Sequence, residues 1–164
     1  GLFGPCGYGF PAICGAKIAC PDVPVVGFAG DGAFGISMNE MVSVNRDDWP
    51  AVTMVIFRNY QWGAEKRNTT LWFDDNFVGT ELAQEVSYAG IAKACGVEGV
   101  QVSSMEELTE ALDRAIKAQM NDGKTTFIEV LLNQELGEPF RRDAMKKPVS
   151  VAGISRDDMR PQRV

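Results

Sequence analysis

Apolar and amphipathic stretches alternate along the 164 residues of the chain. The apolar runs are continuous rather than alternating, which is typical of parallel strands that are buried on both faces. Amphipathic stretches between them indicate βα units around a parallel sheet. We therefore predict an α/β fold with three layers, αβα, and a mostly parallel sheet. The predicted strands cover residues 23–28, 51–57, 99–102 and 125–132.

Helices are predicted between these strands. The best defined follows Ser104, because Ser104 and Glu107 form an S-x-x-E capping box and apolar residues recur on one helical face until Gly123. A long polar segment, residues 58–82, lacks periodicity and is interpreted as a functional loop with room for short helices. Further helices are predicted at residues 12–20, 36–46 and 87–95.

Length and composition fit one globular domain. The formal net charge is −6, and no long basic run is present, which argues against binding to nucleic acid or to an anionic membrane. The chain contains no histidine, so it supplies neither a histidine base nor a histidine metal ligand. Its four cysteines lack C-x-x-C spacing, and we expect buried thiols rather than a disulfide or a zinc site.

Both ends of the chain carry expectations of their own. The chain begins without methionine inside a glycine-rich loop, GLFGPCGYGF, so we expect it to be part of a longer protein. Residues 134–164 are interpreted as a charged tail of the same domain. Because neither a membrane-spanning run nor a leader peptide pattern is seen, the expected location is the cytoplasm.

Two polar motifs follow apolar runs, Gly30-Asp31-Gly32 after the first strand and Asn59 after the second. Ligands of an open parallel sheet bind at the carboxyl ends of its strands. An aspartate beside a diphosphate would repel it unless a divalent cation lay between them. Mg²⁺ takes oxygen ligands, so Asn59 and the backbone carbonyl of Gln61 can complete its set. The sequence therefore predicts a metal ion that holds a diphosphate.

The plainer interpretation of these residues is structural. Gly30-Asp31-Gly32 can be a tight turn, and Asn59 can cap a turn or helix. Two features favour the metal site: both motifs fall at strand ends, and another glycine-rich loop precedes them.

A known family has the same arrangement. Gly30-Asp31-Gly32, followed after 26 residues by Asn59, resembles the motif of thiamine diphosphate enzymes. The segment GPCGYGFPAICGAKIACPDVPVVGFAGDGAFG is similar to the lead-in to that motif in the acetolactate-synthase-like group. The resemblance covers almost the whole chain. It implies the thiamine diphosphate-binding fold, residues 1–164 as a C-terminal diphosphate-binding domain, and thiamine diphosphate with Mg²⁺ as cofactors.

The resemblance also implies roles for single residues. Asp31, Asn59 and the carbonyl of Gln61 would be the protein ligands of Mg²⁺. The backbone N–H groups of Gly32 and Ala33 would hold the diphosphate.

Two positions depart from the family pattern. The family's G-x-M-G turn falls on residues 4–7, and Cys6, a smaller side chain, takes the place of the residue that props the bent cofactor. Arg58 replaces the first asparagine of the usual Asn-Asn pair. The cofactor-binding residues implied in all are Gly4, Cys6, Gly30, Asp31, Gly32, Ala33, Asn59, Gln61, Trp62 and Gly63.

Two further segments, FRNYQWGAEKRNTTLWFDDNFVGTEL and NQELGEPFRRDAMKKP, resemble one branch of this group. That branch converts sulfoacetaldehyde and phosphate to acetyl phosphate and sulfite. Both substrates are anions and the chain is acidic, so local cations would receive them. The candidates are Arg58, Lys66, Arg67 and Arg141. For Asp74-Asp75 and for Arg141-Arg142 with Lys146-Lys147, the plainer interpretation is a solvated surface.

In this family the glutamate that activates the cofactor lies in a separate pyrimidine-binding domain, usually of a partner subunit. Nothing in the chain matches that domain. We therefore predict no catalytic residue in this segment, no turnover by the segment alone, and a working homodimer or homotetramer.

Other functions stay open at this point. One is a different thiamine diphosphate enzyme, such as acetolactate synthase or a 2-oxo acid decarboxylase. Another is a non-catalytic module that binds phosphate or a nucleotide. A Rossmann dinucleotide site is disfavoured, because no G-x-G-x-x-G pattern opens a helix.

Overall fold

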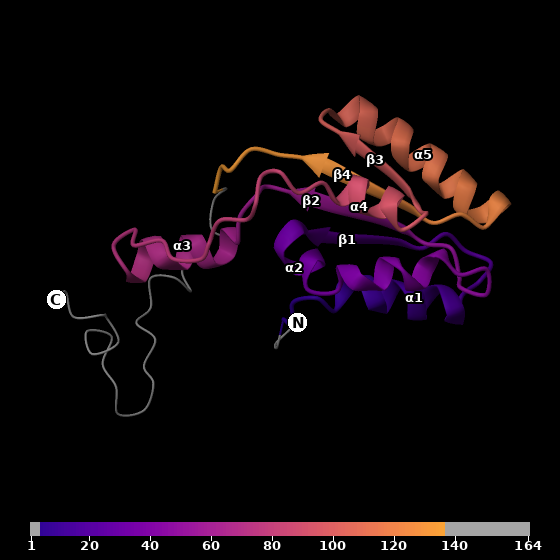
Figure 1. Cartoon of the computed structure of the whole chain (residues 1–164), viewed down its shortest axis with the longest axis horizontal. Helices are drawn as coiled ribbons and strands as arrows, with labels where there is room; N and C mark the ends of the chain where they lie inside the picture. Colours follow the sequence, from indigo (N-terminus) through magenta and orange to yellow (C-terminus); the bar gives the residue numbers. More distant parts are fainter. Residues whose placement is uncertain (1–3, 137–164) are drawn as a thin grey trace. The chain divides into compact units, whose positions relative to one another are not determined.

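A computed structural model describes residues 4–136 of the chain (Figure 1). Contacts divide these residues into two units. The first unit contains residues 4–60 and 83–133, and the second contains residues 61–82 and 134–136. No helix among the described residues combines the length and the apolar composition required to cross a lipid bilayer.

Four parallel strands form the sheet of the first unit, in the order β1-β2-β4-β3. The central strands, β2 and β4, are buried along almost their whole length, as their continuous apolar sequences predict. The predicted parallel sheet is confirmed. The strands are β1 (Val26–Gly30), β2 (Thr53–Arg58), β3 (Glu98–Val102) and β4 (Thr126–Leu131).

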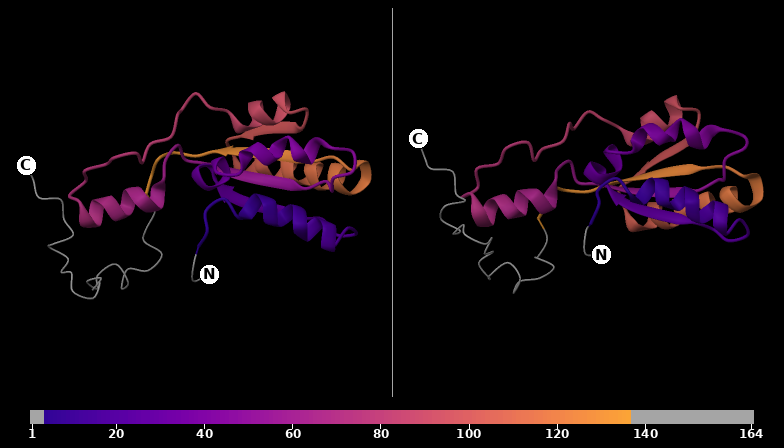
Figure 2. Two further views of the ribbon diagram at one scale, coloured as in Figure 1. Left: turned by 60° about the horizontal axis from the view of Figure 1, so that its bottom comes forward. Right: turned by 90° about the horizontal axis from the view of Figure 1, so that it is seen from below.

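Helices cover both faces of this sheet, which confirms the predicted three layers (Figures 1 and 2). On one face, α1 (Gly9–Ala19), α2 (Asp31–Gly35) and α4 (Tyr88–Ala94) pack into a cluster with an aromatic centre. On the other face, α5 (Met105–Asp122) packs with aliphatic residues of β2, β3 and β4. The aromatic centre consists of Phe10, Phe34 and Phe127, whose ring centroids lie 5.3–5.8 Å apart.

The capping box of α5 is confirmed, with one difference. The Glu107 N–H donates to Ser104 Oγ at 3.1 Å, as predicted. The Glu107 carboxylate, however, accepts from the N–H of Ser103 at 2.7 Å instead of that of Ser104. Gly123 ends the helix in the left-handed conformation, with φ 63°, which glycine adopts without steric cost.

The helix predicted at residues 36–46 was wrong. The helix after β1 is α2, which begins directly at Asp31 and ends at Gly35. Two short 3₁₀ turns then follow, Met38–Met41 and Ser43–Asn45. This stretch is rich in serine and asparagine, whose side chains compete for hydrogen bonds that a regular helix needs.

The polar segment at residues 58–82 holds one regular element. Residues Gly63–Trp72 form helix α3, a ten-residue helix of the second unit. The predicted loop with a short helix is therefore confirmed in outline.

Strand β1 begins later than predicted, at Val26, and the backbone of the preceding residue, Val25, is hydrogen-bonded to a side chain. The Val25 N–H donates to Gln119 Oε1 at 2.7 Å, and Gln119 Nε2 donates to the Val25 carbonyl at 2.9 Å. The same amide donates to Thr53 Oγ1 at 3.0 Å. Gln119, 3% exposed, thus ties α5 to the amino ends of β1 and β2.

Helix α4 lies directly against β3 at one glycine. A Cβ atom added to Gly99 would stand 2.2 Å from the carbonyl oxygen of Ala89. No other residue fits there unless the helix moves away.

All four cysteines are free thiols. Cys14 is buried and Cys95 is partly buried, whereas Cys6 and Cys20 are exposed. The expectation of buried thiols was therefore wrong for Cys6 and Cys20.

Candidate metal and diphosphate site

The Asp31 carboxylate lies at the carboxyl end of β1, where the strand passes into α2 without an intervening loop. The residue is only 2% exposed. Its Oδ1 accepts from the N–H of Gly32 at 3.0 Å, and its Oδ2 accepts from the N–H of Tyr60 at 2.7 Å. Gly30 precedes it in extended conformation with open space at its Cβ position, while Ala33 follows partly buried within α2.

The bond from Tyr60 brings together the two motifs that the sequence placed at strand ends. β1 pairs with β2 up to Gly30 and Phe57, so the residues that follow both strands meet at one edge of the sheet. Asn59 stands between the last residue of β2 and Tyr60. Tyr60 has a φ of 62°, a left-handed conformation that costs a non-glycine residue about 1–2 kcal/mol. The turn at residues 59–60 is therefore held by its surroundings rather than by its own preference.

The chemistry of Asp31 fits a divalent cation. Burial raises its pKa, while the N–H groups of Tyr60 and Gly32 and the charge of Arg58 act in the opposite direction. A carboxylate removed from water favours a proton or a cation. Among residues 4–136, no three His, Cys, Asp or Glu side chains gather around a point that could hold a metal. Neutral oxygens beside one carboxylate are the ligand set that Mg²⁺ accepts together with phosphate and water.

The glycine-rich turn at the start of the chain lies against α2. Gly4 and Gly7 both have positive φ, 61° and 82°. A Cβ atom on Gly7 would stand 2.6 Å from Cγ2 of Ile36, the residue that follows α2. Cys6, between the two glycines, is exposed. The structure thus brings the turn at residues 4–7 close to the helix that Asp31 begins.

Arg58, a candidate for binding a substrate anion, is buried in an ion pair. Its Nη1 donates to Glu129 Oε1 at 2.8 Å, and the two side chains are 5% and 0% exposed. Its Nη2 donates to the carbonyl of Gln84 at 2.6 Å. Its guanidinium carbon lies 4.4 Å from the centre of the Tyr60 ring. Glu129 therefore balances the charge of Arg58. Arg58 was expected to bind a substrate anion, but in the structure it binds this carboxylate instead.

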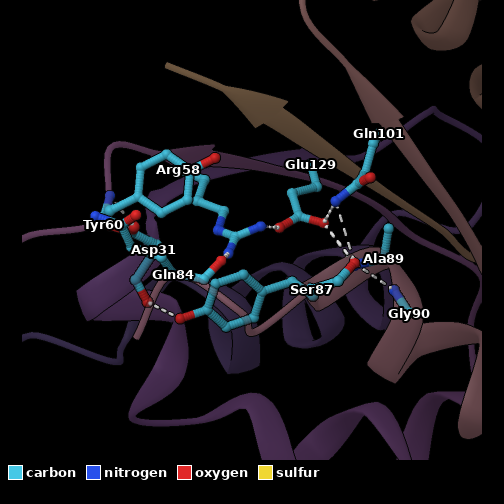
Figure 3. A network of polar contacts seen from close by, with 10 residues as sticks. Asp31, Arg58, Tyr60, Gln84, Ser87, Ala89, Gly90, Gln101 and Glu129 are labelled. Carbon is cyan, nitrogen blue, oxygen red and sulfur yellow. Dashed lines mark hydrogen bonds and ion pairs between the residues drawn. The ribbon is translucent and has the colours of Figure 1, made fainter. Parts of the chain in front are cut away.

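The other carboxylate oxygen of Glu129 binds the start of α4 (Figure 3). It accepts from Ser87 Oγ at 3.1 Å, from the Ala89 N–H at 3.0 Å and from Gln101 Nε2 at 3.0 Å. In α4, the Tyr88 hydroxyl donates to the backbone carbonyl of Asp31 at 3.2 Å. One buried network therefore connects Glu129 with the site.

Sequence reasoning missed Glu129, and a signal for it was present. The segment TTFIEVLL is an apolar strand with one charged residue in its middle. A glutamate is rarely buried without a partner, so this position predicts a buried cation somewhere nearby in the fold. Tyr60 and Tyr88 gave no comparable signal, because their roles depend on a backbone N–H and on one hydroxyl.

Gln61 belongs to the second unit, where its side chain is 2% exposed. Its Nε2 donates to the carbonyl of Gln134 at 2.8 Å, and its Oε1 accepts from Lys66 Nζ at 3.0 Å. Lys66 also forms an ion pair with Glu81, and its side chain is 16% exposed. The side chain of Gln61 is thus fixed by its neighbours.

The remaining predicted residues are also in the second unit or lie outside the described residues. Trp62 donates its N–H to the carbonyl of Thr80 at 2.7 Å, and Gly63 is the first residue of α3. Arg67 donates to the carbonyl of Leu136. Arg141 lies outside the described residues.

Comparison with known proteins gives consistent results. The family described as "Thiamine pyrophosphate enzyme, C-terminal TPP binding domain" matches residues 1–130. The sulfoacetaldehyde acetyltransferase of Roseovarius nubinhibens is 73% identical over all 164 residues, and that of Rhodobacter capsulatus is 74% identical over 162 residues, 99% of this chain.

A solved structure is similar as well. It is the thiamine diphosphate-dependent 4-hydroxybenzoylformate decarboxylase of Rhodococcus jostii RHA1, with a TM-score of 0.68 and 27% identity over 80% of this chain and 24% of that one. The chain spans 27% of the length of each of the two acetyltransferases. A buried aspartate at a strand end, its bond to the turn that follows β2 and the match over residues 1–130 agree with one another. The chain belongs to the thiamine pyrophosphate enzymes, as their C-terminal thiamine pyrophosphate-binding domain.

Proposed function

We propose that the complete protein is a sulfoacetaldehyde acetyltransferase that uses thiamine diphosphate and Mg²⁺. The observation that carries this proposal is the 73% identity to one such enzyme across the whole chain, the polar segment at residues 58–82 included. Fold alone would not suffice, because one fold and one cofactor serve many reactions.

The residues at the end of β1 would hold the metal. Asp31 would supply the single charged ligand, and its bonds to the backbone of Tyr60 and Gly32 fix its orientation. Asn59 and the backbone carbonyl of Gln61 would supply neutral oxygens. Gly32 and Ala33 would hold the diphosphate through their N–H groups, as the family resemblance implies.

Thiamine diphosphate, when bound, would supply carbanion chemistry at its thiazolium ring toward the carbonyl group of a substrate. The reaction proposed for the complete protein converts sulfoacetaldehyde and phosphate to acetyl phosphate and sulfite. This chain's contribution is to bind and orient the cofactor through its metal ion.

Cations of the second unit are our candidates for receiving the two anionic substrates. Arg58 is already paired with Glu129, so it is not among them. Lys66 forms an ion pair with the exposed Glu81. Arg67 donates to a backbone carbonyl, and this neutral acceptor does not balance the charge of the guanidinium. Arg141 is a further candidate from the sequence. We expect Arg67→Gln to raise the KM for phosphate more than Lys66→Gln does.

A second domain is needed for turnover. The glutamate that activates the cofactor in this family is expected in a pyrimidine-binding domain of the same or a partner subunit, with a homodimer or homotetramer as the working form. The expected location is the cytoplasm. We expect residues 1–164 alone to retain the half of the site that binds metal and diphosphate, and not to turn over.

The test uses the complete protein supplied with thiamine diphosphate, Mg²⁺ and sulfoacetaldehyde. Sulfite and acetyl phosphate should appear together, and only when phosphate is present. Pyruvate consumption without any sulfite would contradict the substrate and indicate an acetolactate synthase or a decarboxylase. Thiamine diphosphate binding that is independent of both Mg²⁺ and Asp31 would contradict the cofactor site and favour a non-catalytic phosphate-binding module.

A further inference from the structure

The ion pair between Arg58 and Glu129 has no part in the function proposed above. Both side chains are almost completely buried, so each lost its hydration when the protein folded. Two apolar side chains of similar size often stabilise a fold as well as such a pair does. Stability alone therefore does not account for charges at this place.

From Arg58 one connection runs toward the turn that contains Asn59. The guanidinium carbon lies 4.4 Å from the centre of the Tyr60 ring, within the range of a cation–π contact. Tyr60 is in the left-handed region, and its N–H donates to Asp31 at 2.7 Å. Arg58 thus fixes the ring of a residue whose backbone binds the proposed metal ligand.

From Glu129 a second connection reaches the same aspartate. Its Oε2 accepts from the Ala89 N–H, which fixes the start of α4 (Figure 3). The preceding residue, Tyr88, donates its hydroxyl to the backbone carbonyl of Asp31. The ion pair therefore supports Asp31 from two sides, once through its carboxylate and once through its backbone.

We propose that Arg58 and Glu129 are positioning residues for the divalent cation at Asp31. They hold the turn at residues 59–60 and the start of α4 so that Asp31 and Asn59 present their oxygens in the geometry the metal requires. This inference rests on the proposed function, because it assumes that a divalent cation binds at Asp31.

The inference predicts a loss of metal affinity without a matching loss of chemistry. Once enough Mg²⁺ is present to fill a less well ordered site, the bound cofactor is the same. The concentration of Mg²⁺ needed should therefore rise, while kcat at saturating Mg²⁺ and cofactor should change little.

The experiment uses the complete protein and the double variant Arg58→Met, Glu129→Gln. Methionine fills the volume of the arginine, and glutamine keeps an acceptor for the Ala89 N–H. Since both charges are removed together, neither stays buried without a partner. Mg²⁺ affinity is measured by calorimetric titration at saturating thiamine diphosphate, and the melting temperature is measured without ligands.

The matched control is Gln119→Leu, which breaks the buried polar network at the opposite end of the sheet. We expect the double variant to bind Mg²⁺ about 10–100-fold more weakly, the loss typical when a residue that supports a metal ligand is replaced. The control should bind Mg²⁺ as the wild type does, even where its melting temperature falls further.

Other results would contradict the inference. Unchanged Mg²⁺ affinity in the folded double variant would overturn it, and so would an equal loss in the control, which would show a general effect of lower stability. If the double variant does not fold, Arg58→Lys decides. Lysine keeps the charge but lacks the planar guanidinium, so we expect roughly tenfold weaker Mg²⁺ binding, and an unchanged affinity would overturn the inference.

The wild type separates this inference from the proposed function. Wild-type protein without any Mg²⁺-dependent binding of thiamine diphosphate would overturn both. Normal wild-type binding together with normal binding in the variants would overturn only the positioning role.

Discussion

The two ends of the sheet both carry buried polar side chains, but they use them differently. At the amino end, Gln119 binds Val25 and Thr53 through one neutral amide group. At the carboxyl end, Arg58 and Glu129 form an ion pair that is nearly inaccessible to water. Both arrangements satisfy buried hydrogen-bonding groups, yet only the second required two ions to lose their hydration.

The two networks also connect to different parts of the fold. The bonds of Gln119 stay between α5 and the starts of two strands. Those of the ion pair extend through Tyr60 and Tyr88 to Asp31. A buried ion pair therefore indicates a functional site nearby when the residues it contacts, here Tyr60 and Tyr88, in turn bind a second buried carboxylate, here Asp31. The following variants test this difference.

The largest effect is expected for Asp31→Asn. The amide has the shape of the carboxylate, and its one oxygen can still accept from the Tyr60 N–H. It loses the acceptor for the Gly32 N–H and the charge that attracts a divalent cation. Mg²⁺-dependent binding of thiamine diphosphate should weaken more than about 100-fold, beyond the loss expected for a supporting residue. Calorimetric titration of the complete protein measures it. The exposed Asp48→Asn is the control, and equal behaviour of both variants would contradict a site at Asp31.

Arg58→Met alone should cause the largest loss of stability. It leaves Glu129 buried and charged without its partner, which typically costs about 3–5 kcal/mol. Hydrogen exchange of the β4 amides would report the free energy of local opening. If the single variant is as stable as the double variant with Glu129→Gln, the two charges do not depend on each other.

Gln119→Leu should cost less, about 1–3 kcal/mol, because it takes the partner from a neutral group, the Val25 N–H, instead of from an ion. Hydrogen exchange at the start of β1 measures the change. A loss greater than that of Arg58→Met would reverse the proposed difference between the two ends.

Ser104→Ala gives the smallest effect, a loss of about 1 kcal/mol in the free energy of unfolding, through loss of the α5 cap.

The neighbouring Glu107 adds a pH dependence to the stability of the same helix. Hydrogen bonds from the N–H and hydroxyl of Ser103 lower the pKa of Glu107. Its contribution is complete above its unfolded pKa and is lost as the pH falls through the lower, folded pKa. The protection factors of α5 amides, which correct for the pH dependence of intrinsic exchange, should therefore fall in acid, and Glu107→Gln should remove that dependence.

Much of the fold followed from periodicity. The four apolar runs became the four strands, and Ser104, Glu107 and Gly123 marked both ends of α5. These signals are local, so one sequence is enough to show them. The stretch after β1 failed because its hydrophobic spacing allows a helix, while serine and asparagine favour shorter turns there.

The candidate site was predicted in part for a similar reason. Strand ends and glycines indicated where Asp31 and Asn59 would meet, and the bond between Asp31 and Tyr60 agrees with that placement. The ion pair was not predicted, because Arg58 and Glu129 are 71 residues apart and meet only through strand order. Arg58 was interpreted from its charge, which says nothing about whether a cation faces a substrate or another strand.

Gly99 shows that residues far from any ligand can also be intolerant of substitution. It has no side chain and no polar role, yet the Ala89 carbonyl leaves no room for a methyl group. Even alanine would push α4 outward, and with it the N–H that Glu129 binds. In a scan of all single substitutions, this position should behave like a site residue. A map of mutational tolerance would thus mark the residues that hold α4 and Glu129 in place as well as the residues that bind the ligand.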